Sequence, residues 1–126
     1  MNPPANPRAK AREALGRQGE QLAAEFLEQS GLRVVDRNWR CREGEIDIVA
    51  TDGRVLVICE VKTRSDTRYG TPLEAISARK HARLRRLAVS WVVAHGLLVD
   101  EIRIDIVGVL RVAPGEFTIE HVRGVG

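Results

Sequence analysis

The stretch that most constrains the fold is residues 44–64, GEIDIVATDGRVLVICEVKTR, which has the pattern of a β-hairpin with charged residues on apolar strands. Two apolar runs flank Asp52-Gly53, a dipeptide that accepts positive φ at little cost and favours a two-residue type I′ turn. With that loop, Asp47 would lie opposite Ile58. The turn therefore predicts on which face of the hairpin each side chain lies.

Three charged side chains of this hairpin are expected to converge. Side chains alternate between the two faces with period two, so Asp47, Glu60 and Lys62 would share one face. Glu45 would lie opposite Glu60, and Asp47 and Glu60 would be diagonal neighbours about 7–8 Å apart at the backbone. A loop with an odd number of residues would put Asp47 on the other face, so this inference depends on the turn.

The second strand of the hairpin is continuously apolar from Val55 to Cys59, which is typical of a strand covered on both faces. Isolated charges buried beside it would cost several kcal/mol each unless they are paired or bind a metal. Lys62 alone cannot neutralise two carboxylates. A hard divalent cation such as Mg²⁺, which binds one or two carboxylates together with water and phosphate, would complete the charge balance.

The chain has 126 residues, 44% of them hydrophobic, which suits one domain over residues 1–126. Within it we expect a disordered tail at residues 1–10, and a C-terminal edge strand and tail at residues 114–126. The net charge of +3 is a mild basic excess and only weak evidence for an acidic partner. No internal repeat is visible.

The two cysteines, Cys41 and Cys59, form no CxxC motif and no cluster at zinc-ligand spacing. They are expected to be reduced thiols in a cytoplasmic protein. The N-terminal segment MNPPANPRAK has no apolar core, and no run approaches 18 apolar residues, so we expect neither a signal peptide nor a membrane anchor.

A first helix is predicted from Ala9 to Gln29, with Ser30-Gly31 as its stop. Its glycines, Gly16 and Gly19, cost helix propensity and make most sense as a flat surface that packs closely on a sheet. Glu20 falls at the border of the apolar stripe. It is either an ordinary solvated glutamate or a carboxylate that reaches the hairpin.

Leu32–Asp36 is predicted as a short strand and residues 37–44 as the connector to the hairpin. The connector holds three arginines, Arg40 among them, that could contact phosphates. Its tryptophan, Trp39, either stacks on a base or caps the core, and we favour the core.

Beyond Lys62, residues 63–70 are polar and predict a loop. A second helix should begin at Thr71, where Thr71-Pro72-Leu73-Glu74 has the pattern of a capping box, or after a break at Ser77, and should run to His95. Its apolar stripe, which would pack on the sheet, is Leu84, Leu87, Ala88, Trp91 and Val92.

The start of this second helix is strongly basic, with five cations and no acid in residues 79–86. Arg79, Arg83 and Arg86 lie opposite the apolar stripe. A solvated face is the usual explanation of such runs, but the imbalance favours a phosphate backbone as the ligand. Lys80 lies at the edge of the stripe, from which it could lean toward the hairpin.

Val99 to Val109 alternates, with isoleucines inward and Arg103 and Asp105 outward, and predicts a strand covered on one face. Asp105 would then be structural. Glu116–Val122 reads as a final edge strand. The order of elements predicts an α/β fold, with a mixed sheet and helices packed on it.

The hairpin, with Asp47 followed by Glu60-Val61-Lys62, resembles the PD-(D/E)XK signature of the restriction-endonuclease-like nucleases. The wider pattern resembles the bacterial YraN-like family, small proteins similar in fold to archaeal Holliday-junction resolvases. The residues that carry this resemblance are Gly16-x-x-Gly19-Glu20, Asn38 with Arg40, Gly44-Glu45-Ile46-Asp47, Glu60-Val61-Lys62-Thr63-Arg64, Tyr69-Gly70, Pro72, Lys80 and Arg103-Ile104-Asp105.

The resemblance implies a restriction-endonuclease-like αβββαβ core. In it, Asp47 and Glu60, with the backbone carbonyl of Val61, would ligate Mg²⁺ or Mn²⁺. In resolvase-type members a glutamate of the first helix joins the metal site, and Glu20 occupies that position here.

The leading hypothesis is therefore metal-dependent hydrolysis of phosphodiesters in DNA, including branched or junction DNA. Glu20, Asp47 and Glu60 would hold the metal, and a charged Lys62 would orient the attacking water and stabilise the transition state. The flanking phosphates would contact Arg64 and Lys80, together with the arginines of the second helix. A four-way junction needs two active sites, so that substrate would require a homodimer.

Two other hypotheses remain. The chain could be a nucleic-acid-binding module with weak or no catalysis. It could also be purely structural, with Glu60 and Lys62 as an internal salt bridge.

Overall fold

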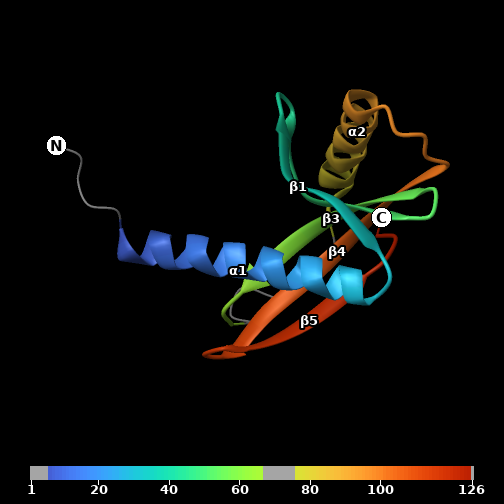
Figure 1. Cartoon of the computed structure of the whole chain (residues 1–126). Coiled ribbons are helices and arrows are strands. Elements are labelled where there is room, and N and C mark those ends of the chain that lie inside the picture. The colour runs from blue at the N-terminus through green and yellow to red at the C-terminus, as the bar shows by residue number, and fades with distance from the viewer. Residues whose placement is uncertain (1–5, 67–75, 126) are drawn as a thin grey trace.

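The structure, a computed structural model, describes residues 6–66 and 76–125. The described residues form two helices and one five-stranded sheet (Figure 1). In chain order the elements are α1 (Pro7–Gln29), β1 (Arg33–Cys41), β2 (Gly44–Asp52), β3 (Val55–Arg64), α2 (Ala78–His95), β4 (Glu101–Ala113) and β5 (Glu116–Val122).

The strands lie in the sheet in the same order as in the sequence. Neighbouring strands are antiparallel except β3 and β4, which are parallel, so the chain must cross between them, and α2 lies in that crossover. The first six elements form the predicted αβββαβ core, with β5 added at the edge. The α/β fold with a mixed sheet is confirmed and is consistent with the restriction-endonuclease-like fold.

The two helices pack on opposite faces of the sheet, each over its own apolar cluster. Leu27 of α1 packs with Ile48 and Val57 on one face. Leu87 and Trp91 of α2 pack against the other face in a second cluster. Because both faces are covered, β3 is buried from Leu56 to Cys59, as its continuous apolar run predicts.

Helix α1 begins at Pro7, earlier than predicted, behind an Asn6 cap whose side chain accepts from Arg8 N. Residues 7–10 therefore belong to the helix, while residues 1–5 of the expected tail lie outside the described residues. Gly19 packs directly on β3, because a Cβ added there would lie 2.0 Å from Thr63 Oγ1. The predicted flat contact surface is thus confirmed at Gly19, whereas an added Cβ at Gly16 meets nothing within 4 Å.

Helix α2 begins after Ser77, whose hydroxyl accepts from Lys80 N, and ends at His95, followed by Gly96 as a C-cap in the left-handed conformation. The second of the two predicted starts is therefore correct, and so is the end at His95. The alternative start at Thr71 and the motif residues Tyr69-Gly70 lie outside the described residues.

The predicted hairpin loop is wrong by one residue. Asp52 pairs with Val55, so the loop is Gly53-Arg54, with Gly53 at φ +60°. Shifting the loop moves every partner, and Ile58 pairs with Val49 rather than with Asp47. The loop still holds two residues, so the side chains of β3 that share a face are the ones predicted.

The predicted end of the first strand is also corrected. The predicted connector of residues 37–44 is mostly strand, since β1 continues to Cys41 and pairs there with Gly44. Its alternation of polar and apolar residues is broken near Asn38, which hid the strand in the sequence. Trp39 is half-buried against the α2 cluster, so it caps the core as expected.

Strand β4 is covered on both faces, so the prediction that Asp105 points outward is wrong. Asp105 is fully buried and contacts β5 and the C-terminal segment, which lie beside it. It accepts hydrogen bonds from Arg103 Nε at 2.9 Å and Gly124 N at 2.9 Å, and its Oδ2 lies 2.7 Å from His121 Nε2. Burial opposes ionisation, but these hydrogen bonds hold the pKa of Asp105 below its ordinary value. Its predicted structural role is in keeping with this network.

Both cysteines are free, and Cys59 is buried in the α1 cluster. Among the described residues, no helix is both long enough and apolar enough to span a membrane.

Candidate active site

The candidate site is centred on Asp47, at the point where β2 separates from β3. The pairing of these two strands ends at Ile48 and Cys59. One residue further, the Asp47 side chain takes the place of a backbone partner, since its Oδ2 accepts from Val61 N at 2.9 Å. A carboxylate is thereby fixed between two diverging strands.

The side-chain alternation of β2 breaks at this residue. Ile46 packs in the α2 cluster and Ile48 in the α1 cluster, although residues two apart in a regular strand share a face. On β1, Asn38 lies between the Arg37–Ile48 and Trp39–Ile46 pairs and has φ +52°. Both strands therefore change face here, and Asp47 lines a cavity on each side of the sheet.

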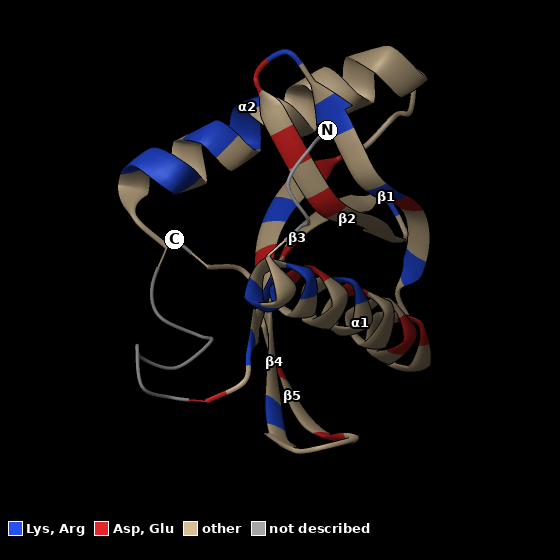
Figure 2. Cartoon of the chain, turned by 90° about the vertical axis from the view of Figure 1, so that its left-hand side faces the viewer, with Lys and Arg blue, Asp and Glu red and all other residues tan. Residues whose placement is uncertain are grey.

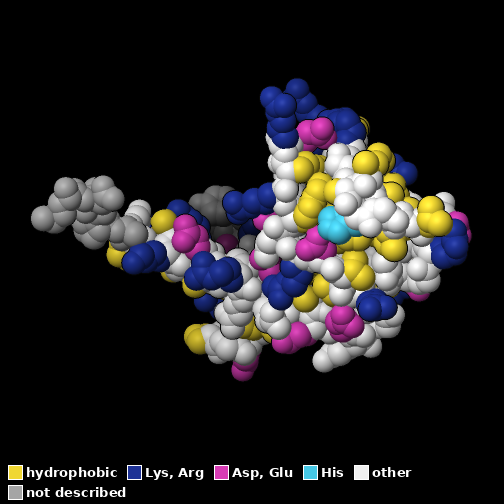
Figure 3. Space-filling model, turned by 45° about the horizontal axis from the view of Figure 1, so that its top comes forward, with side chains coloured by type: hydrophobic (Ala, Val, Ile, Leu, Met, Phe, Trp, Pro, Cys, Tyr) yellow, Lys and Arg dark blue, Asp and Glu magenta, His cyan; other side chains and the backbone are white. Residues whose placement is uncertain are grey.

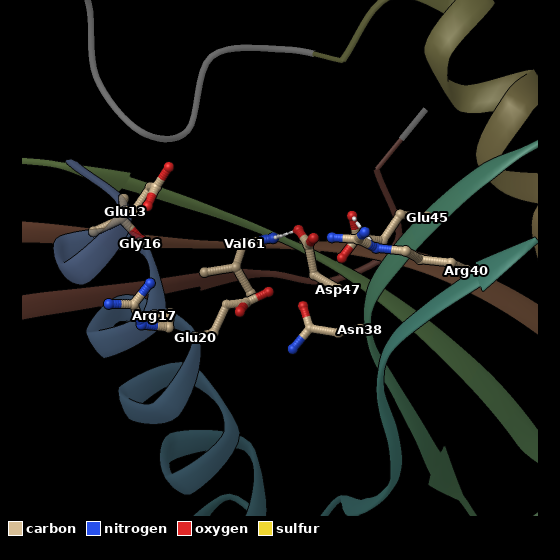
Figure 4. Close-up of a pocket in the computed structure, with 10 residues that line it drawn as sticks. Glu13, Gly16, Arg17, Glu20, Asn38, Arg40, Glu45, Asp47 and Val61 are labelled. Atoms are coloured by element: carbon tan, nitrogen blue, oxygen red, sulfur yellow. Dashed lines mark hydrogen bonds and ion pairs between the residues drawn. The ribbon is translucent and has the colours of Figure 1, made fainter. Parts of the chain in front are cut away.

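The cavity on the α1 side, about 550 Å³ in volume, brings Glu20 to Asp47 (Figure 4). Figure 4 shows Glu20 facing Asn38 of β1, with Asp47 beside them. With its amide nitrogen turned toward the carboxylates, Asn38 donates to Glu20 Oε1 at 2.8 Å and to Glu45 Oε1 at 3.1 Å. Asn38 thus links α1 to β2 across the cavity.

The cavity on the α2 side is smaller, about 200 Å³, and holds Glu60. As predicted, Lys80 leans into it and forms an ion pair with Glu60 Oε1. The other oxygen, Glu60 Oε2, is buried and has no hydrogen-bond partner among the described residues. Arg83 also lines this cavity. It therefore faces the site, and the prediction that it lies with Arg79 on the helix face opposite the apolar stripe is wrong.

Carboxylates outnumber cations around Asp47. Burial and the nearby charges of Glu20, Glu60 and Glu45 raise the pKa of Asp47 to about 6, against the opposing hydrogen bond from Val61 N. Burial also raises the pKa of Glu20, although Asn38 and Arg37 oppose this rise. The cluster is therefore short of positive charge.

Two of these residues, Asp47 and Glu60, are placed to bind a divalent cation. In the part of the chain that the structure describes, no three His, Cys, Asp or Glu side chains are arranged to hold a metal ion together. Two carboxylates suffice for Mg²⁺, which keeps several of its waters. The unpartnered Glu60 Oε2 beside Asp47 supplies an oxygen that a cation would satisfy.

The structure positions the other predicted residues less closely. Lys62 is half-buried on the α2 face of β3, two residues beyond Glu60, and lines neither of the two cavities. Arg40 is exposed and pairs with Glu45 at 3.4 Å on the rim of the α1-side cavity. The exposed arginines Arg64, Arg79 and Arg86 lie outside both cavities.

Basic side chains nevertheless surround the acidic strand. Figure 2 shows acidic residues along β2, with basic residues at the N-terminal half of α2 and at the end of the β1–β2 hairpin. An anionic polymer that reached Asp47 would therefore meet positive charge on both sides.

Sequence reasoning gave no role to three residues that line the α1-side cavity, Glu45, Asn38 and Arg17. Asn38 could have been found, because asparagine is enriched at positive φ and the position interrupts a strand. No local signal points to Arg17, since only the packing angle of α1 brings it to the cavity.

The fold and the site together define an α/β protein with a half-buried acidic centre at the divergence of two strands. The chain matches the model of Uncharacterised protein family UPF0102 over residues 19–109. It is 55% identical over 118 residues to a UPF0102 protein of Nocardioides sp., covering 94% of this chain and 95% of that protein. It is 56% identical over 117 residues to a UPF0102 protein of Arthrobacter sp., covering 93% and 99%. The chain therefore belongs to the UPF0102 family, which confirms the family predicted from the sequence.

Among solved structures, the chain is similar to that of Pyrococcus furiosus SfsA in complex with Ca²⁺. The two chains are 14% identical with a TM-score of 0.46, over 88% of this chain and 65% of that chain.

Proposed function

We propose that the protein is a metal-dependent nuclease that hydrolyses phosphodiester bonds in DNA, with its active site at Asp47 and Glu60. One observation carries this proposal. Glu60 has a buried oxygen without a partner among the described residues, in a cavity that it shares with a second carboxylate whose pKa is raised. Such a pair gains most from a hard divalent cation.

The proposed ligands of Mg²⁺ or Mn²⁺ are Asp47, Glu60 and the backbone carbonyl of Val61, with Glu20 joining from the α1 side. When bound, the metal would polarise the scissile phosphate and lower the pKa of a coordinated water. Asp47 is held for this role by Val61 N, and Glu20 is held by Asn38.

Basic residues of the chain would bind and orient the DNA. Lys62 follows Glu60 on the same face of β3, from which its ammonium group would stabilise charge that develops on the phosphate. Lys80 neutralises Glu60 in the metal-free protein and could turn to a phosphate once a cation takes its place. Arg83 lines the cavity, and Arg40, Arg64, Arg79 and Arg86 would contact the flanking backbone.

The decisive experiment is a cleavage assay on single-stranded, flapped and four-way-junction DNA with Mn²⁺, alongside RNA of the same sequences. Asp47→Ala and Lys62→Ala should each lower the rate at least about a hundredfold, because the first removes a proposed metal ligand and the second removes the ammonium group that would stabilise charge on the phosphate. Glu120→Gln, at an exposed position of β5, is the control and should retain the wild-type rate.

Cleavage that survives both substitutions would come from a contaminant and would remove the support for a nuclease. DNA binding without cleavage in any divalent cation would instead identify a binding module. Cleavage of the four-way junction would further require a homodimer, which sedimentation can measure. We expect this activity in the cytoplasm, where Cys41 and Cys59 would stay reduced.

A further inference from the structure

The N-terminal half of α1 projects beyond the sheet (Figure 1). The residues that α1 buries are Gly19, Ala23, Ala24 and Leu27, and none precedes Gly19. Residues 7–18 therefore form an arm, which extends about 18 Å at roughly 1.5 Å per residue.

The arm is basic, and its cations stand apart from the ion pairs of the fold. Arg8, Lys10, Arg12 and Arg17 are exposed, and Glu13 is the one acid among residues 7–18. Figure 3 shows the dark-blue side chains along it. Within residues 6–66 and 76–125, none of the recorded salt bridges involves these four side chains. Arg8 and Arg12, one helical turn apart, repel each other in the free protein.

The arm leads directly into the acidic cavity. Arg17 lines the α1-side cavity together with Glu20 and Asp47. Arg40 of the β1–β2 hairpin lines the same cavity. Positive charge thus flanks the carboxylates on both sides, and on the α1 side it continues outward along the arm.

We propose that the arm binds the sugar-phosphate backbone of a DNA duplex that leaves the α1-side cavity. This inference rests on the proposed function and adds a substrate class to it, namely double-stranded DNA on the α1 side. An arm of about 18 Å spans roughly five base pairs at about 3.4 Å each. A straight helix suits a stiff duplex, whose persistence length is about 150 base pairs.

An anionic membrane is a less suitable ligand for the arm. Membrane-surface helices carry large apolar residues opposite their cations. Between its cations this arm has Ala9, Ala11 and Ala14 instead, with Leu15 as its one large aliphatic side chain.

The test compares two triple variants of the full chain. Arg8→Ala/Lys10→Ala/Arg12→Ala removes three cations of the arm and, because alanine is the best helix former, retains the helix. Arg33→Ala/Arg54→Ala/Arg123→Ala removes the same charge from exposed positions outside the arm, and is the control. The probe is a 30-base-pair duplex, its binding measured by fluorescence anisotropy over a range of salt, in EDTA and again with Ca²⁺.

The arm variant should bind about ten- to a hundredfold more weakly at ~100 mM salt, and its slope of log K against log salt should fall by up to ~2.7. The control should stay within about threefold of the wild type. Extending a short duplex on one side by about five base pairs should strengthen binding by the wild type but not by the arm variant.

An arm variant that binds within twofold of the wild type with the same slope would overturn the inference. So would binding of the wild type to phosphatidylserine vesicles in preference to the duplex. If the wild type binds no nucleic acid at all, it is the proposed function that fails. Circular dichroism should show equal helix content in the arm variant and the wild type, which makes a loss of affinity attributable to charge.

Discussion

Asp47 combines an anchored position with an unfavourable charge. Its side chain replaces a backbone group in the ladder between β2 and β3, while three other carboxylates lie near enough to oppose its ionisation. At neutral pH the folded protein therefore holds a carboxylate whose charge is less favourable than it is in the unfolded chain. In the absence of a cation this arrangement costs stability.

Replacing Asp47 with asparagine should stabilise the metal-free protein at high pH. The pKa of Asp47 rises from an ordinary 3.8 to about 6, so the folded state binds more protons than the unfolded state in this window. Stability then falls as the pH rises from about 4 to about 6, by up to about 3 kcal/mol, and stays lowered above it. The amide oxygen of the substituted side chain could still accept from Val61 N.

Urea denaturation in EDTA should thus show Asp47→Asn more stable than the wild type by about 1–3 kcal/mol at pH 8, with no difference below pH 4. Asp52→Asn, at an exposed position, is the control and should change stability by less than about 0.5 kcal/mol. A variant less stable than the wild type at pH 8 would contradict the conclusion that burial and the neighbouring carboxylates oppose the ionisation of Asp47.

Lys80 should compete with a divalent cation for Glu60. Lys80→Met keeps the length of the side chain but removes the ion pair with Glu60, so the metal-free protein should lose about 1 kcal/mol. Because Mn²⁺ then displaces no internal cation, the thermal shift should reach half its maximum at a severalfold lower Mn²⁺ concentration. Arg79→Met, at an exposed neighbouring position, should leave that concentration unchanged. If Lys80→Met abolished the Mn²⁺ shift, Lys80 would be supporting the site rather than competing in it.

At the scale of elements, the contact between α1 and β3 determines where Glu20 lies. Gly19 sits against Thr63, and Glu20 follows it directly into the α1-side cavity. A bulkier residue at position 19 would push the helix away from the sheet and carry Glu20 with it.

The two glycines of α1 give a matched pair for testing this contact. Gly19→Ala should lower the free energy of unfolding by about 1–3 kcal/mol, because its Cβ would overlap Thr63. Gly16→Ala should raise it by up to ~1 kcal/mol, because the space is open and alanine favours the helix. Chemical denaturation measures both. Equal effects of the two substitutions would show that α1 packs on β3 in another register.

At the scale of the whole molecule, Asp105 joins the C-terminal segment to the rest of the fold. It bonds Arg103 on its own strand, His121 of β5 and the backbone of Gly124, and the ring of His121 packs edge-on against Phe26 of α1. The cluster therefore holds β4, β5 and the C-terminal residues together beneath one helix.

Asp105→Ala should cost about 3–5 kcal/mol at pH 7, because it leaves Arg103 and His121 without their buried partner. The pKa of Asp105 is lowered in the fold, so its stabilisation is present above its ordinary pKa of 3.8 and is lost as the pH falls below it. The difference between wild type and variant should accordingly shrink as the pH falls below 3.8. Urea denaturation at pH 7 and pH 3 measures it, and a difference that grew toward acid pH would contradict a lowered pKa.

The sequence by itself determined the order of elements, the buried strand β3 and the helix faces, because these depend on local periodicity and caps. The sequence also predicted that Asp47, Glu60 and Lys80 lie near one another. That prediction does not depend on the register of the loop, because either two-residue loop leaves the same side chains of β3 on each face. Only the tertiary structure decided that the loop is Gly53-Arg54, that β1 and β2 change face at Asn38 and Asp47, and that Asp105 is buried. Those outcomes depend on the packing of distant segments, such as Val61 N against Asp47 and His121 against Asp105, which no local pattern records.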